Sequence, residues 1–307
     1  MMHVFSTLSV SFTAMNSRRH FLTTALSTAF ATPLFAQNTK LSYKGENIHF
    51  GLVTYMWGAD WDLPTLIKNC ETSEVLGVEL RIEHAHKVEP NLNAVQRKEV
   101  QKRFEDSPVD VLGMGTNCEF HSADPAEVKK QIELAKEYIK LSHDIGGSGV
   151  KVKPNNLTKE VPVEKTLEQI GNSLAEIGDY ALGFGQEIRL EVHGGVSDLG
   201  HIKTVMEAAA RDNVRVCWNS NPDDLKGDGI AANFAKVKDF LGATTHIREV
   251  NEPGYPYPEL ARLLVDADYA GWVLLEARTK PGDRVAALAE QRKLFMEMIT
   301  QARAAAA

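Results

Sequence analysis

The fold is decided by residues 187–276, in which four short apolar segments recur: EIRLEVH (187–193), VRVCWN (214–219), THIREV (244–249) and WVLLE (272–276). Each segment carries a polar side chain at or near its C-terminal end: Glu191, Asn219, His246 and Glu276. In a parallel barrel these strand ends converge on one mouth, so residues far apart in sequence point toward one ion or one substrate. Two carboxylates, an imidazole and an amide carbonyl form a ligand set that suits Mn, Mg, Co or Zn. The sequence therefore predicts a divalent metal site.

Four further apolar segments precede these, at residues 48–54, 77–82, 109–114 and 149–153. Longer amphipathic segments separate all eight, which is the pattern of βαβ units in a parallel sheet. Helix starts are indicated by Asp62, Asp124 and Asp198, and Gly146-Gly147 is typical of a helix end. The sequence thus predicts an α/β fold with a single (β/α)8 TIM barrel.

Residues 1–36 are interpreted as a twin-arginine export signal. The basic SRRHFL (17–22) precedes TTALSTAFATPLFA (23–36), an apolar region too short to span a bilayer that ends in the small residue Ala36. A buried N-terminal helix is the alternative. Export predicts a periplasmic or otherwise exported protein whose mature domain, residues 37–307, is one TIM barrel, for which about 250 residues is typical.

The charge and the cysteines restrict the possible partners. Residues 1–36 contain two arginines and no acid, so their removal changes the net charge from −7 to −9. An acidic protein of this kind argues against a nucleic-acid partner. After residue 37 no segment reaches the length of a transmembrane helix. Cys70, Cys118 and Cys217 lie outside any C-x-x-C motif and are predicted to be free thiols.

The four polar residues, in the motifs LEVH, WNSN, HIREV and LLEA, resemble the xylose isomerase-like TIM barrel superfamily, which includes sugar phosphate isomerases and epimerases and endonuclease IV. The resemblance implies that Glu191, Asn219, His246 and Glu276 bind a divalent metal. As in ketose 3-epimerases, it implies that Glu191 and Glu276 are catalytic and exchange protons with one sugar carbon from opposite faces. Where that family usually has Asp followed three residues later by His, this chain has Asn219 and Pro222, so the site has one negative charge fewer.

Removal of a proton next to a carbonyl forms an enediolate, and a metal stabilises its developing charge. Return of the proton to the same carbon gives epimerisation, and transfer to the adjacent carbon gives aldose–ketose isomerisation. We therefore expect an exported, metal-dependent sugar isomerase or epimerase. An unphosphorylated sugar or keto-sugar is favoured because no Gly-rich phosphate loop is present. The alternative for each glutamate is a structural ion pair, with Arg189 or Arg278 nearby in sequence.

Six further residues near strand ends are candidates for substrate binding: Lys153, His193, Arg248, His84, His86 and His121. Lys153, His193 and Arg248 each stand two residues after another polar residue of the same segment. Side chains two residues apart lie on the same face of a strand, so each of the three is expected to face the barrel mouth. The last three either bind sugar hydroxyls, cap loops, or hold a second metal as the resemblance to endonuclease IV suggests. Tyr55, Trp57 and Trp61 either line the sugar site or pack as ordinary loop residues.

Other functions remain open at this point. An enediolate with a leaving group on the next carbon eliminates it, so a lyase or dehydratase acting on a 3-keto-glycoside uses the same acid and base. A non-catalytic sugar-binding protein is the alternative that Asn219 keeps open. A nuclease is disfavoured by the acidic charge and by Pro222. The sequence leaves the sugar, the metal and the oligomeric state, including a homo-oligomer, undetermined.

Overall fold

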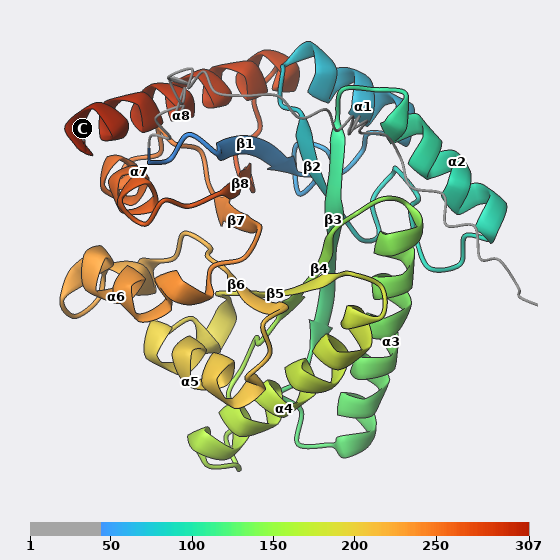
Figure 1. Ribbon diagram of the computed structural model, residues 1–307, viewed down its shortest axis with the longest axis vertical. Coiled ribbons are helices and arrows are strands. Elements are labelled where there is room, and N and C mark those ends of the chain that lie inside the picture. The colour runs from blue at the N-terminus through green and yellow to red at the C-terminus, as the bar shows by residue number, and fades with distance from the viewer. Residues whose placement is uncertain (1–43, 307) are drawn as a thin grey trace, which may run out of the picture. The chain divides into compact units, whose positions relative to one another are not determined.

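The computed structural model describes residues 44–306, and the predicted export signal with its boundary at residue 36 lies outside them. Within this range eight parallel strands alternate with eight α-helices (Figure 1), so the predicted TIM barrel is confirmed. The strands are β1 (Ile48–Val53), β2 (Gly77–Arg81), β3 (Asp110–Glu119), β4 (Gly149–Lys153), β5 (Glu187–Glu191), β6 (Val214–Cys217), β7 (Thr244–Ile247) and β8 (Gly271–Leu275). The helices are α1 (Leu63–Thr72), α2 (Ala94–Glu105), α3 (Pro125–Asp144), α4 (Val163–Leu182), α5 (Leu199–Ala209), α6 (Gly229–Val237), α7 (Tyr257–Asp266) and α8 (Arg284–Ala306).

The strand order is β6-β5-β4-β3-β2-β1-β8-β7, and the neighbours in this order are paired in parallel. The barrel closes between β6 and β7 through two isolated bridges, Val216 with Leu241 and Asn219 with His246. Backbone hydrogen bonds accompany them, including one of 2.6 Å from the His246 N–H to the Trp218 carbonyl oxygen. Two of the four predicted metal ligands therefore face each other across this closure.

The predicted helix starts are confirmed by their capping bonds. The carboxylate of Asp62 accepts from the Thr65 N–H at 2.9 Å, and Asp124 and Asp198 cap α3 and α5 in the same way. Such caps satisfy backbone N–H groups that have no partner in the first turn of a helix. At the other end of α3, Gly146 has a φ of 89°, a conformation that glycine adopts without steric cost.

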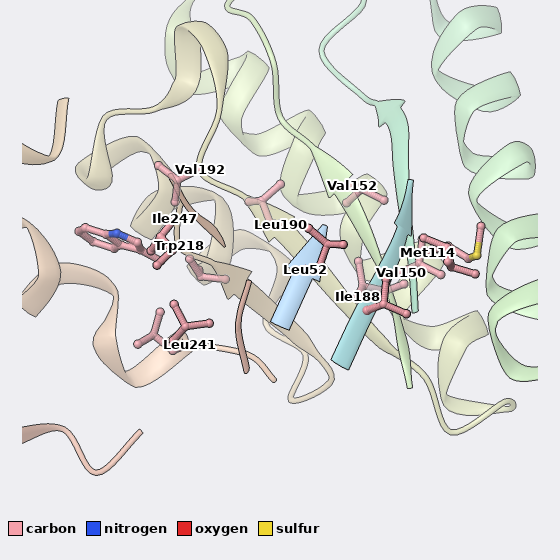
Figure 2. Close-up of a cluster of buried hydrophobic side chains, with 14 of the residues drawn as sticks. Leu52, Met114, Val150, Val152, Ile188, Leu190, Val192, Trp218, Leu241 and Ile247 are labelled. Carbon is pink, nitrogen blue, oxygen red and sulfur yellow. The ribbon is translucent and has the colours of Figure 1, made fainter. Parts of the chain in front are cut away.

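Side chains alternate along β4 and β5 between two environments. Val150, Val152, Ile188 and Leu190 are buried in a large apolar core that includes residues of both the strands and the helices, part of which Figure 2 shows. The residues between them on β4 and β5 are charged or glycine and face the opposite side. A separate small apolar cluster joins Val53, Leu112 and Leu274. Because β3 and β8 are not neighbours in the sheet, this cluster lies inside the barrel, which leaves much of the interior to polar groups.

The described residues contain no helix that is long and apolar enough to cross a membrane. All three cysteines are free and buried, as predicted. Burial raises the pKa of Cys70 to about 12 and that of Cys118 to about 11. The thiols of Cys70 and Cys118 are therefore protonated and unreactive at neutral pH.

Candidate active site at the barrel mouth

Glu191, His246 and Glu276 lie together at the C-terminal ends of β5, β7 and β8. A carboxylate oxygen of each glutamate and a ring nitrogen of His246 all lie within 4.8 Å of one another, and the three residues are buried. The Glu276 N–H donates to the Ile247 carbonyl oxygen at 2.7 Å, which fixes Glu276 beside the end of β7. The structure thus brings together three residues that are separated by 85 positions in the sequence.

Glu191 is held at both carboxylate oxygens. Lys151 Nζ donates to Oε2 at 2.6 Å, and Asn219 Nδ2 donates to Oε1 at 2.8 Å. The Lys151 side chain is 1% exposed and also donates to the Thr116 carbonyl oxygen at 3.2 Å. Burial alone would raise the pKa of Glu191, but the charges of Lys151 and His246 hold it well below its ordinary value. Glu191 is therefore an ionised and rigidly placed carboxylate.

Glu276 stands in the opposite environment. No donor within residues 44–306 is hydrogen-bonded to its carboxylate, and the residue is buried with 8% exposure. Burial and the negative charge of Glu191 raise the pKa of Glu276. The two carboxylates are therefore driven toward different protonation states, as an acid and a base must be.

His246 is held from the barrel interior by Glu79, a fully buried residue of β2. Nε2 of the ring lies 3.3 Å from Glu79 Oε1, although the two groups are not aligned as a hydrogen bond. Burial alone would lower the pKa of His246, but Cys217 and Glu79 raise it well above the ordinary value. A carboxylate behind a histidine ring fixes the orientation of that ring.

A family model for xylose isomerase-like TIM barrels matches residues 67–221, a segment that includes Glu79, Lys151, Glu191 and Asn219. The chain belongs to the xylose isomerase-like TIM barrel family. The resemblance predicted from the sequence motifs is thereby confirmed. No curated protein matches the sequence at a significant level.

Several solved structures share this xylose isomerase-like fold. An L-ribulose 3-epimerase is 16% identical with a TM-score of 0.73, over 84% of this chain and 97% of that one. The 3-keto-D-glucoside 4-epimerase YcjR from E. coli is 14% identical with a TM-score of 0.67, over 82% and 99%. The IOLI protein, solved with a zinc atom, is 14% identical with a TM-score of 0.69, over 83% and 98%. At these identities the similarity shows the fold alone.

The donor set of this xylose isomerase-like barrel fits a divalent cation. Within the described range, both ring nitrogens of His246 and Oδ1 of Asn219 are buried without a hydrogen-bond partner. Because Asn219 uses its Nδ2 to bind Glu191, its carbonyl oxygen is the atom left for a cation. Buried polar atoms without partners are costly, and a cation bound to the two carboxylates would also satisfy the Asn219 oxygen and one ring nitrogen of His246. The set of oxygens and imidazole suits Mn, Mg, Co or Zn.

Replacement of His246 by alanine is expected to weaken binding of a divalent metal by at least about 100-fold, because even residues that merely orient metal ligands contribute 10- to 100-fold. Metal content after dialysis and competition with a coloured chelator measure this. His201→Ala, on α5, is the matched control and should leave the affinity unchanged. Full metal occupancy of dialysed His246→Ala would show that His246 is not a ligand.

Of the predicted substrate-binding residues, the structure places Lys153 and His193 beside Glu191. Both are half-buried, and both interact electrostatically with the Glu191 carboxylate. Burial and the charge of Lys151 lower the pKa of Lys153, and it forms no ion pair with any described residue. Lys153 is therefore a cation at the mouth that is available to a ligand.

Arg248, by contrast, lines a separate cavity of about 160 Å³ between the loops that follow β6 and β7, together with Ser220, Tyr255 and Tyr257. Its backbone N–H donates to the Tyr257 hydroxyl at 3.0 Å, and its Nε is buried without a partner within residues 44–306. The alternation that predicted a position beside His246 ends with β7 at Ile247. The structure therefore places Arg248 with the tyrosines of this loop region.

Next to this cavity lies Asp224, which accepts from the Tyr255 hydroxyl at 2.5 Å and from the Asn221 N–H at 2.8 Å. Burial raises the pKa of Asp224 to about 7, although these two donors oppose the effect. Its folded pKa thus lies above the ordinary value of 3.8. The stability that this carboxyl contributes is complete below pH 4 and is lost as the pH rises through 7.

Asp224→Asn is therefore expected to make the free energy of unfolding less dependent on pH, because an amide stays neutral throughout. Urea unfolding at pH 5 and pH 8 measures the effect, and the difference between the two pH values should shrink by up to about 3 kcal/mol, because the folded and unfolded states differ in protonation over about two pH units of this range. Asp223→Asn is the matched control, since Lys226 lowers the pKa of that carboxyl. A pH dependence in Asp224→Asn equal to that of wild type would contradict this assignment.

His86 caps a loop. Its Nε2 donates to the Arg81 carbonyl oxygen at 2.8 Å and its Nδ1 accepts from the Val88 N–H at 3.1 Å, so neither nitrogen is left for a sugar. His84 is bonded through Nδ1 to Thr54 Oγ1 at 2.9 Å. Burial lowers the pKa of each histidine to about 4, so both are neutral at pH 7. Of the two, His84 alone has a nitrogen without a partner among the described residues.

His121 lines a surface pocket of about 400 Å³ with Glu119, Glu127 and Thr158. Across residues 44–306, the group of Glu191, His246 and Glu276 is the one set of three possible ligands close enough to hold a metal. The histidines after β2 and β3 therefore form no second metal site of this kind.

The aromatic residues after β1 are mainly structural. Trp57 is buried and its Nε1 donates to the Thr279 carbonyl oxygen at 2.9 Å. Trp61 is buried with the Arg284 guanidinium 4.9 Å from its ring centroid. Tyr55 is half-buried with Arg81 5.7 Å above its ring. Loop packing is thus the role that the structure gives to both tryptophans.

The sequence did not predict the roles of Glu79, which contacts His246, and Lys151, which contacts Glu191. Glu79 lies within β2 and faces the barrel interior, where its carboxylate stands beside the ring of His246. Lys151 takes the ion pair with Glu191 that the sequence offered to Arg189, which instead pairs with Glu187. In both strands the period of two marks the face, because GVEL and GVKVK alternate apolar residues with charged residues or glycine.

Proposed function

We propose that this protein is a metal-dependent sugar isomerase or epimerase that acts on an unphosphorylated sugar or keto-sugar. The observation that supports it is the placement of two buried carboxylates, Glu191 and Glu276, with His246 at the mouth of a xylose isomerase-like barrel. The printed activities of the L-ribulose 3-epimerase and the 3-keto-D-glucoside 4-epimerase, which share the fold, favour the same class of chemistry.

In this proposal Glu191 and Glu276 divide the proton transfer. Lys151 and Asn219 hold Glu191 as a fixed carboxylate, which suits removal of a proton from the sugar carbon. Glu276 has a raised pKa, which suits delivery of a proton from its carboxyl oxygen. Asn219, His246 and the two glutamates would hold the metal, which when bound supplies electrostatic stabilisation of negative charge on a sugar carbonyl oxygen. Lys153 adds a positive charge near the same place.

Incubation of the metal-loaded protein with ketopentoses, ketohexoses and 3-keto-glucosides in D2O tests the proposal. We expect an epimeric or isomeric sugar that carries deuterium at the reacting carbon, detected by NMR. Metal-stripped protein is the control and should show no exchange. Release of an aglycone or an unsaturated product would instead identify a lyase, and bound sugar without any exchange would identify a sugar-binding protein.

We also propose that the protein is exported through the twin-arginine pathway, on the basis of Arg18 and Arg19 in SRRHFL and the apolar region after them. Wild-type protein should be recovered outside the cytoplasm with an N-terminus near Gln37. Changing both arginines to lysine should leave unprocessed precursor in the cytoplasm. Processed protein outside the cytoplasm in equal amounts from both forms would contradict the proposal.

A further inference from the structure

The loops after β3, β4 and β5 are connected by three polar side chains: Glu119, Asn155 and His193. Asn155 Nδ2 donates to Glu119 Oε2, and Asn155 Oδ1 lies 2.9 Å from His193 Nδ1. Glu119 ends β3, Asn155 lies two residues beyond β4, and His193 lies two residues beyond β5. Three neighbouring strands thus contribute one residue each to a continuous chain of hydrogen bonds at the barrel mouth.

The order of these bonds decides where the imidazole carries its hydrogen. An ionised carboxylate only accepts hydrogen bonds, so the amide nitrogen of Asn155 must face Glu119. The carbonyl oxygen of Asn155 then faces His193, and it also only accepts. Nδ1 of His193 must therefore donate, which leaves Nε2 of the neutral ring as an acceptor.

The backbone holds Asn155 in place for this purpose. Its φ is 60°, in the left-handed region that asparagine tolerates better than most residues. Its carbonyl oxygen accepts from the Gly195 N–H at 2.6 Å. A Cβ on Gly194 would lie 2.3 Å from that same oxygen, so the loop after β5 packs directly on the Asn155 backbone. Unusual backbone conformations that are fixed in this way are concentrated at functional sites.

His193 lies in extended backbone two residues beyond Glu191, which is the last residue of β5. The ring is half-buried and has Glu191 and Lys153 as electrostatic neighbours. A hydrogen-bond acceptor at this place borders the region where Glu191 would meet a sugar carbon.

We propose that Glu119 and Asn155 are positioning residues, which hold His193 with Nδ1 protonated so that Nε2 accepts a hydrogen bond from a sugar hydroxyl beside Glu191. The choice of a sugar as the ligand rests on the proposed function. The position of the ring hydrogen rests on the hydrogen-bond chain alone.

Asn155→Gly tests the positioning role, because glycine adopts a φ of 60° freely and keeps the backbone bond to Gly195 while the amide is removed. NMR of protein with ¹⁵N-labelled histidine at pH 8, with the His193 signals assigned by their loss in His193→Gln, reports which ring nitrogen carries hydrogen. In wild type we expect Nδ1 protonated and Nε2 bare, and in Asn155→Gly a shift toward protonated Nε2. A wild-type ring protonated at Nε2 would overturn the proposal.

With a sugar substrate, Asn155→Gly should raise KM roughly three- to tenfold, the effect of one lost hydrogen bond, while kcat changes by less than about threefold. Asn156→Gly, at the exposed next residue, is the matched control and should leave both constants unchanged. An unchanged KM in Asn155→Gly would overturn the role in sugar binding. A wild type that turns over no sugar but shows the expected ring hydrogen would refute the proposed function and leave the positioning intact.

Discussion

Glu191→Gln and Glu276→Gln should each lower sugar turnover by about 10²- to 10⁴-fold, which is the usual contribution of a general acid or base. Glutamine keeps the size of the side chain and its carbonyl oxygen but cannot exchange a proton at neutral pH. Sugar binding should therefore persist in both variants. Turnover is measured by NMR of the product, and binding by calorimetry at the same metal loading.

The two variants should also differ from each other in solvent exchange. If each glutamate serves one face of the reacting carbon, deuterium incorporation should persist in one variant through the glutamate that remains, although net conversion stops. Glu83→Gln, at an exposed position after β2, is the matched control and should keep full turnover. Near wild-type turnover in both site variants would exclude a mechanism with two carboxylates and favour a sugar-binding protein.

Lys151→Met should destabilise the metal-free protein by about 3–5 kcal/mol, the typical result of removing one partner from a buried ion pair. The variant leaves Glu191 buried with Asn219 as its remaining hydrogen-bond donor, and it also removes the bond to the Thr116 carbonyl oxygen. The long apolar side chain of methionine fills most of the space of lysine, so the loss of stability reflects the missing charge rather than a cavity. Urea unfolding at pH 7 measures it.

Lys153→Met is the matched control, since it lies on the same strand and face but is half-buried and forms no ion pair with a described residue. We expect it to change stability by less than about 1 kcal/mol. The double variant Lys151→Met/Glu191→Gln should recover part of the loss, because it leaves no unpaired charge. Equal stability of the two methionine variants would show that the buried pair contributes little to folding.

The strands and the helix starts were predictable because local patterns determine them. The apolar segments predicted seven strands to within about two residues at each end, and the aspartate caps predicted the starts of three helices. The third strand runs to Glu119 rather than 114, after a shift in its pairing with β2 between Val78 and Glu79. Such a shift depends on how two strands meet, and a single segment carries no sign of it.

The convergence of Glu191, His246 and Glu276 was predictable because barrel topology alone brings strand ends together. Contacts between side chains were not. Lysine and arginine follow the same alternation at 151 and 189, but only packing decides that Lys151 reaches Glu191 while Arg189 turns to Glu187. His86 is a comparable case, since its two backbone partners are set by the path of one loop.

Because the barrel closes between β6 and β7 through only two bridges within the described residues, a ligand at the mouth can strengthen the closure of the barrel. Asn219 and His246 are themselves one of these bridges, so any ligand that binds both side chains ties the first six strands to the last two. A ligand bound in the site would then stabilise the boundary between β6 and β7, where the described strands are paired only by isolated bridges. Amide hydrogens such as those of Gly242 and His246, which donate across this boundary, would exchange more slowly with solvent in the loaded protein. Hydrogen exchange at the boundary between β6 and β7 would thus measure how much of the site is occupied by a ligand.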